Sequence, residues 1–118
     1  MQAVLHVTGL PSAPADAAAA FHARWLPQAR MLIAGLHGED RSLLIVARCA
    51  DHTHAEWRLA VVRMLAREAA PARVNLVGCD EPAAVERFAD YLAGAAGVTG
   101  QYLPANLQLA SEIEEEDR

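Results

Sequence analysis

The sequence predicts an α/β domain with about four parallel strands and three helices, arranged in two or three layers. Three short apolar runs rich in branched residues, each followed by a longer helical pattern, support this prediction. Such runs are typical of strands buried on both faces of a parallel sheet. The alternation of strands and helices with short connections favours a single α/β domain, which we assign to residues 1–104.

The strands are expected at residues 3–7, 42–48, 73–78 and 99–103. The first three contain the apolar runs AVLHV, SLLIVA and RVNLV. The fourth, within GQYLP, carries a weaker signal and is closed by Pro104.

The helices are expected at residues 14–34, 54–70 and 81–94. Pro14 suits a first helical turn, whereas Pro27 lies inside the first helix and should kink or split it.

Side chains that could cap the second and third helices are also present. Thr53 and Glu56 have the spacing of a capping box at the start of the second helix. Asp80 is expected to cap the third helix, which has Pro82 in its first turn.

Strand order affects how the sheet is covered. If the strands lie in sequential order, right-handed crossovers place all three helices on one face and leave the other bare. A 118-residue chain is not expected to expose such a face. Either one helix crosses to the opposite face or another subunit covers part of the surface.

Composition narrows the class of protein. With 118 residues, 53% hydrophobic and 21% charged, the chain is expected to form one globular domain. No apolar run approaches the roughly 20 residues of a membrane span, and the start lacks a secretory signal pattern, so we expect a cytoplasmic protein. Two cysteines suggest no disulfide framework.

Charge is concentrated at the end of the chain. The net charge is −5, and residues 112–118 contain five of the acids and one arginine. The nearly neutral remainder argues against nucleic-acid binding, which needs a basic face. Residues 105–118 are predicted to form an acidic, disordered tail.

Several stretches resemble one large family. LAREAAPARVNLV (residues 65–77) is similar to the helix-to-strand passage of the short-chain dehydrogenase/reductases, and YLAGAAGVTGQYLP (91–104) is similar to their late helix and final strand. QAVLHVTGLP, RWLPQARMLIAG and SLLIVARCA are weaker matches upstream. Residues 2–103 therefore resemble the C-terminal half of such an enzyme, which implies a small, truncated Rossmann-like domain.

The resemblance also implies what is missing. No strand is followed by the family's glycine-rich turn, so we expect no nucleotide cofactor. The family's catalytic tyrosine falls on Asp51, its lysine on Ala55 and its serine near Ala50, and the chain contains no lysine. Tyr91 and Tyr102 lie in other elements. We expect no catalytic residues of the dehydrogenase kind.

A ligand cleft is expected beyond the carboxyl ends of the strands, as in other parallel sheets. Its candidate residues are Thr8, Gly9, Cys49, Asp51, His52, Cys79 and Asp80. The stretch CADHTH matches no standard zinc spacing, and helix starts naturally collect such residues, so we expect no metal. A redox pair of Cys49 and Cys79, or a different enzyme using Cys49, Asp51 and His52 or His54, is a minor alternative.

Both early helices are apolar around much of their circumference. The resemblance implies that residues 14–34 and 54–70 pair with their copies in a four-helix bundle, as the basis of a homodimer. The candidate interface residues are Phe21, Trp25, Trp57, Val61 and Met64.

These observations favour a non-catalytic interaction, scaffold or regulatory module. A heteromer with a complete dehydrogenase is a related hypothesis. The main alternative is a module that binds a small ligand or nucleotide in the cleft.

Overall fold

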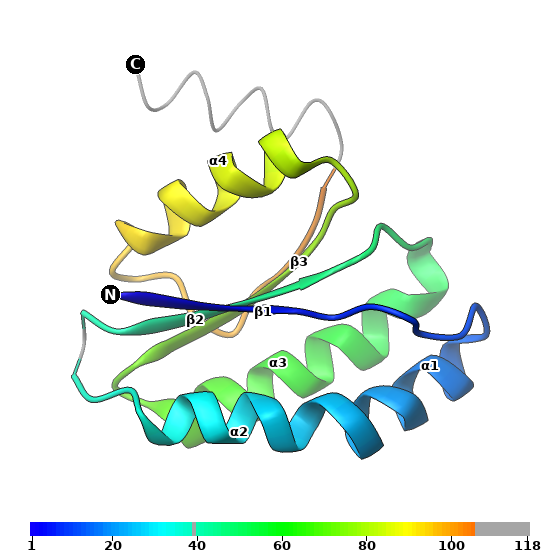
Figure 1. Cartoon of the computed structure of the whole chain (residues 1–118), viewed down its shortest axis with the longest axis horizontal. Helices are drawn as coiled ribbons and strands as arrows, with labels where there is room; N and C mark the ends of the chain where they lie inside the picture. The colour runs from blue at the N-terminus through cyan, green and yellow to red at the C-terminus, as the bar shows by residue number, and fades with distance from the viewer. Residues whose placement is uncertain (39, 106–118) are drawn as a thin grey trace.

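The computed structural model describes residues 1–38 and 40–105. In chain order the elements are β1 (Gln2–His6), α1 (Pro14–Ala20), a π-helical turn (Phe21–Trp25), α2 (Leu26–Ala34), β2 (Ser42–Ala47), a 3-10 helix (His52–His54), α3 (Ala55–Ala69), β3 (Arg73–Gly78), α4 (Pro82–Ala93) and β4 (Tyr102–Pro104). All four strands are parallel and lie in the order β1-β2-β3-β4. The predicted α/β fold and its element order are confirmed (Figure 1).

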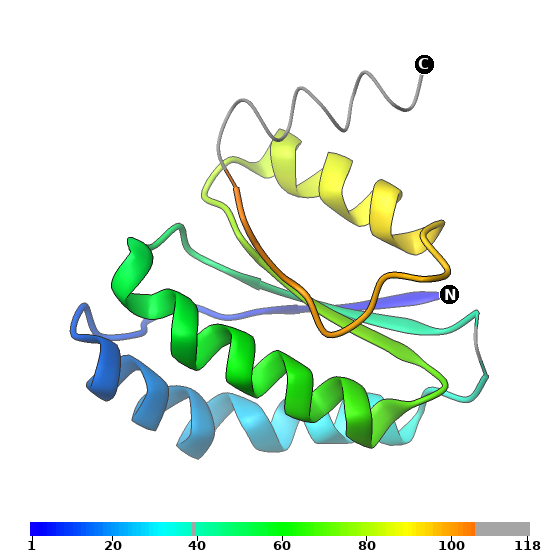
Figure 2. The same cartoon turned by 180° about the vertical axis from the view of Figure 1, so that it is seen from behind.

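The domain has three layers, with the sheet in the middle (Figures 1 and 2). Leu43 and Ile45 of β2 face α1, α2 and α3 and join the larger apolar core. Leu44 and Val46 of the same strand face α4 and join a second core with Phe88. Because alternate residues of β2 enter opposite cores, all six of its residues are buried.

The position of α4 resolves the question of how the sheet is covered. The strands do lie in sequential order, but α4 packs on the face opposite α1, α2 and α3. The first two crossovers are right-handed and the third, from β3 through α4 to β4, is left-handed (Figures 1 and 2). A helix of the same chain thus covers much of the face that uniform right-handed crossovers would leave bare.

Pro27 neither splits nor ends the first helix. Helical structure continues from α1 through the π-helical turn into α2. The wider turn ends at Trp25, two residues before Pro27, whose missing N–H would interrupt the α-helical ladder. The predicted boundaries 14–34 therefore hold, and the proline is accommodated within the helix.

The predicted fourth strand begins too early. Gly100 has a left-handed φ of 70°, and the Thr99 hydroxyl accepts a hydrogen bond from Val74 N at 3.0 Å. The segment before Tyr102 is therefore attached to β3 through a turn, by the Thr99 side chain and by single backbone bonds, from Gly100 N to Val74 O at 2.7 Å and from Leu76 N to Gln101 O at 2.9 Å. The other boundaries differ by only one residue. The predicted tail lies outside the described residues, except for Ala105, whose N–H donates to Gly78 O at 2.9 Å.

No helix in the part of the chain that the structure describes is long and apolar enough to cross a bilayer.

Candidate functional site

A cleft of about 410 Å³ opens where β1 and β2 end. Its walls come from the loop after β1 and the loop after β2, with contributions from α1, the 3-10 helix and α3. Thr8, Gly9, Cys49 and Asp51 line it, as the sequence predicted. The parallel arrangement explains the position, because carboxyl ends of parallel strands meet at one edge of a sheet.

A second hollow of about 320 Å³ continues along the same edge toward β3. Thr8 lines both spaces, and Cys79 and Asp80 line the second. Six of the seven predicted residues therefore lie along this edge. His52 is exposed and lines neither space.

Asp51, rather than Thr53, caps the helix that begins in the cleft. Its carboxylate accepts hydrogen bonds from the Thr53 backbone N–H at 2.9 Å and from the Thr53 hydroxyl. These bonds, the hydroxyl bond most, lower the pKa of Asp51 from its ordinary value of 3.8. The predicted capping box of Thr53 and Glu56 is wrong, because a 3-10 turn places the helix start two residues earlier.

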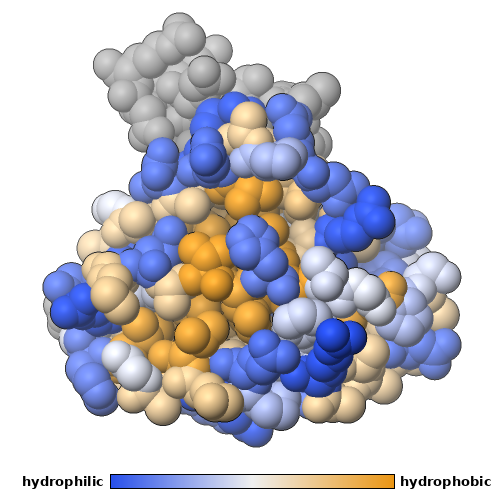
Figure 3. Space-filling model, viewed as in Figure 1, coloured by the Kyte–Doolittle hydropathy of each residue, from blue (hydrophilic) through white to orange (hydrophobic). Residues whose placement is uncertain are grey.

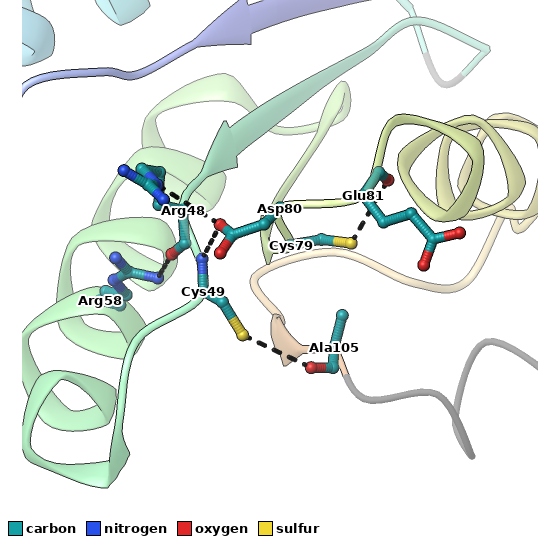
Figure 4. A network of polar contacts seen from close by, with 7 residues as sticks. All are labelled: Arg48, Cys49, Arg58, Cys79, Asp80, Glu81 and Ala105. Carbon is teal, nitrogen blue, oxygen red and sulfur yellow. Dashed lines mark hydrogen bonds and ion pairs between the residues drawn. The ribbon is translucent and has the colours of Figure 1, made fainter.

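Asp80 does not cap α4, contrary to the prediction. The residue at that position is Glu81, whose side chain forms no capping bond. The Asp80 carboxylate instead accepts a hydrogen bond from Cys49 N at 2.7 Å and lies 3.6 Å from Arg48 Nε (Figure 4). Asp80 therefore joins the ends of β2 and β3 instead of stabilising its own helix.

The two cysteines have different surroundings. Cys49 is exposed and its thiol donates to Ala105 O at 3.7 Å, whereas Cys79 is buried and donates to Glu81 O at 3.7 Å. Both are free thiols. Within residues 1–38 and 40–105, no group of three His, Cys, Asp or Glu side chains is placed to hold a metal ion.

His54 holds the two loops of the cleft together. Its Nδ1 accepts a hydrogen bond from the Trp57 indole N–H at 3.0 Å. Because the indole nitrogen can only donate, the proton of the neutral ring lies on Nε2, which donates to Ser12 O at 2.9 Å. This buried histidine thus connects the start of α3 to the loop after β1.

Arg58 is a buried, charged cleft residue that the sequence prediction missed. It is only 3% exposed and lines the larger space. Its Nη1 donates to Arg48 O at 2.9 Å and to Tyr102 Oη at 3.3 Å. The helical spacing of the apolar residues could have indicated that Arg58 is buried. Arg58 shares a helical face with Val61, Val62 and Leu65, and all three are buried.

The predicted interface residues divide into two groups. Phe21, Trp25 and Val61 are buried in the larger core of a single chain, so they are not available on its surface. Trp57 and Met64 are partly buried against that core and retain some exposure. The wide apolar character of these helices is largely explained by packing within one chain.

Comparison with known proteins supports the resemblance. A family model described as short chain dehydrogenase-like protein matches residues 5–105. No curated protein and no solved structure gives a match. Since the family model spans most of the chain, including all the helices and the cleft, the protein belongs to the short chain dehydrogenase-like family.

Proposed function

We propose that this family member is not a dehydrogenase and acts in the cytoplasm as an interaction module. Asp51 and Ala55 occupy the positions that the resemblance assigns to the catalytic tyrosine and lysine. The Asp51 carboxylate is bound to Thr53, and Ala55 begins α3. Tyr102 lies on β4, and its hydroxyl accepts a hydrogen bond from Arg58. This arrangement supplies no tyrosine–lysine pair for proton transfer.

The observation that best supports an interaction role is the open edge of β1. Met1 O accepts from Ser42 N, and Val7 N donates to Val46 O. In a parallel ladder this register directs the backbone groups of Gln2, Val4 and His6 away from β2. None of the strands that the structure describes pairs with that side.

The edge also lacks the usual protection against pairing. Natural edge strands carry charges, prolines or bulges that discourage partners. β1 reads QAVLH, with neither a lysine nor a proline, and Val4 at its centre is 40% exposed. The strand therefore favours addition of another strand.

An apolar groove lies beside this edge. It has a volume of about 440 Å³ and runs between β1 and α4. Figure 3 shows hydrophobic surface gathered at the centre of this face. The residues that line the groove are Val4, His6, Val46, Cys79, Asp80, Pro82, Val85, Glu86 and Ala89.

The partner that we propose is a second copy of the chain. Two antiparallel β1 strands can pair around a two-fold axis at Val4, because its outward N–H and C=O can bond to the same groups of the copy. Gln2 would then lie opposite His6 of the other copy, and this pairing contains no like-charge clash. A strand from a complete dehydrogenase is the corresponding heteromeric partner.

The helix-mediated homodimer is a second candidate. Met31 on α2 is 77% exposed, and Trp57 and Met64 are partly exposed on α3. The same two helices also carry charged residues that contact each other, including the Arg30–Glu68 ion pair at 2.8 Å. This surface is less uniformly apolar than the sequence suggested, so we place it second.

Mass measurement by light scattering after size exclusion tests both candidates. Val4→Lys and Met31→Lys add the same charge to different exposed surfaces. Pairing at the sheet edge predicts a dimer that Val4→Lys converts to monomer and Met31→Lys leaves intact. The reverse pattern identifies the helix-mediated dimer. A monomeric wild type that also captures no other chain from its native host would overturn the interaction proposal.

A further inference from the structure

We propose that the 410 Å³ cleft binds a small organic anion, with a carboxylate or phosphate group held near Arg58. This site is separate from the β1 edge and does not depend on the proposed dimer. Arginine presents a planar fork of donors that suits both anion types.

The first argument is the burial of Arg58 without a counter-ion. Removing a guanidinium from water is costly unless an anion or a full set of acceptors replaces the water. Nη1 has two acceptors, but both are neutral oxygens, and the buried Nε has no partner. Among residues 1–38 and 40–105, no carboxylate forms an ion pair with Arg58.

The second argument is the positive character of the cleft walls. The 3-10 helix and α3 together begin at the cleft, where Asp51 and His54 line it. Because the Asp51 carboxylate already accepts from the Thr53 N–H there, the positive charge of this wall comes from Arg58. Arg48 also lines the cleft, and its exposed side chain is only loosely paired with Asp80, at 3.6 Å.

Two carboxylates oppose an anion in the cleft, Asp51 in its wall and Asp80 beside Arg48 and Cys49. The Asp51 carboxylate is bound by the Thr53 N–H and hydroxyl, which lower its pKa and hold it at the start of the helix. Of the two arginines of the cleft, Arg48 is paired with Asp80, so Arg58 is the cleft cation that no carboxylate of the described residues pairs with.

The third argument concerns the body of the ligand. The cleft volume falls in the range of about 300 to 1,000 Å³ that is usual for small-molecule sites. Its walls include apolar side chains, namely Val7, Leu10, Pro11, Ala17 and Ala50. A charged head with a short apolar body fits this combination better than an inorganic ion alone.

A purely structural role for Arg58 is the competing explanation. Its bonds to Arg48 O and Tyr102 Oη join the end of β2 to β4. Loss of stability in an Arg58 variant would therefore not establish anion binding. Only a response to added anion separates the two roles.

Thermal unfolding and calorimetric titration of the full chain provide that response. Sodium phosphate, sodium hexanoate and sodium chloride would be compared at equal ionic strength. We expect phosphate or hexanoate, but not chloride, to raise the unfolding temperature and to give saturable binding. Whichever of these two anions binds more tightly shows whether the site prefers a phosphate group or a carboxylate with an apolar body. Absence of any specific shift would overturn the proposal.

Two acidic substitutions keep the test independent of folding. Thr8→Glu places a carboxylate at the exposed rim of the cleft, whereas Gln28→Glu adds the same charge on exposed α2. Thr8→Glu should weaken anion binding about tenfold or more, because a like charge opposes the ligand. Gln28→Glu should leave binding unchanged. Equal affinities in the two variants would show that the anion binds elsewhere.

Arg58→Gln supplies the direct measurement if it folds. It removes the charge and keeps a polar amide on the same unbranched stem. The variant should lose the anion-dependent shift even where its own unfolding temperature stays close to that of the wild type. Retention of the full shift would assign Arg58 to structure alone.

Discussion

The Asp80 carboxylate accepts a hydrogen bond from the backbone N–H of Cys49 at 2.7 Å, across 31 positions of sequence. This bond joins the loop after β3 to the loop that follows β2 (Figure 4). The same carboxylate pairs loosely with Arg48. The loops after β2 and β3 are therefore bonded to each other along this edge of the sheet, beside the two hollows.

Asp80→Ala should lower the free energy of unfolding by about 1 kcal/mol, because an exposed charge-assisted hydrogen bond is lost. Urea denaturation measures the change. Asp90→Ala is the matched control, since it removes an exposed carboxylate from α4. Equal effects of the two substitutions would contradict a structural role for the Asp80–Cys49 bond.

Arg73→Met should be more damaging, by about 3 kcal/mol. The buried guanidinium donates to Leu92 O at 2.8 Å, to Ala95 O at 2.7 Å and to Ala93 O at 3.2 Å. These are carbonyls at the end of α4 and just beyond it, and buried acceptors without partners are costly.

Hydrogen exchange in α4 gives a local readout for the Arg73 substitution. Exchange should quicken there before it quickens in α2. Arg67→Met at the exposed end of α3 should leave exchange in α4 unchanged. Uniform quickening across the domain in Arg73→Met would argue against a specific attachment of α4.

Asp51→Asn should make the free energy of unfolding depend less on pH in the acid range. Hydrogen bonds from Thr53 lower the pKa of Asp51 in the folded chain, so the carboxylate stabilises the fold above its ordinary value of 3.8. That contribution is lost as pH falls through the lower, folded-state pKa. Asparagine keeps an acceptor for Thr53 but does not titrate.

The pH test compares unfolding by urea at several values between neutrality and the acid limb. The difference between wild type and Asp51→Asn should shrink as the carboxylate becomes protonated. A difference that stays constant over the whole range would show that Asp51 does not contribute through its charge.

Nicotinamide dinucleotides are expected to leave the chain unaffected. The sequence VTGLPSAP after β1 contains one glycine and two prolines, so it offers few backbone donors to a pyrophosphate. Neither NAD nor NADH should shift the unfolding temperature, and NADH fluorescence should not change on mixing. A saturable shift with either compound would contradict the prediction, and an intact dehydrogenase serves as the positive control.

The local pattern of apolar and polar residues was sufficient to predict most of the fold. The apolar runs of β1, β2 and β3 and the spacing between them identified each strand and helix to within one or two residues, apart from the start of β4. That start was missed because the Thr99 hydroxyl and the left-handed Gly100 interrupt the regular ladder there, although backbone bonds to β3 remain. Such side-chain attachment leaves no periodic signal.

The sequence predicted where the cleft lies, but not which groups its side chains contact. Parallel strands bring their carboxyl ends together, so Thr8, Cys49 and Asp80 could be grouped from sequence. Which donor each side chain meets depends on residues far along the chain. Arg58 was missed for the same reason, since its partners belong to β4 and to the end of β2.

The sequence by itself determined the order of strands and helices, the family resemblance, and the absence of lysine from the position where the dehydrogenases need one. These depend on composition and on short-range periodicity. The tertiary structure decided that α4 covers the second face, that Phe21, Trp25 and Val61 belong to the core of one chain, and that β1 is left as an open edge. Those outcomes depend on crossover handedness and on packing between distant segments, which local pattern does not specify.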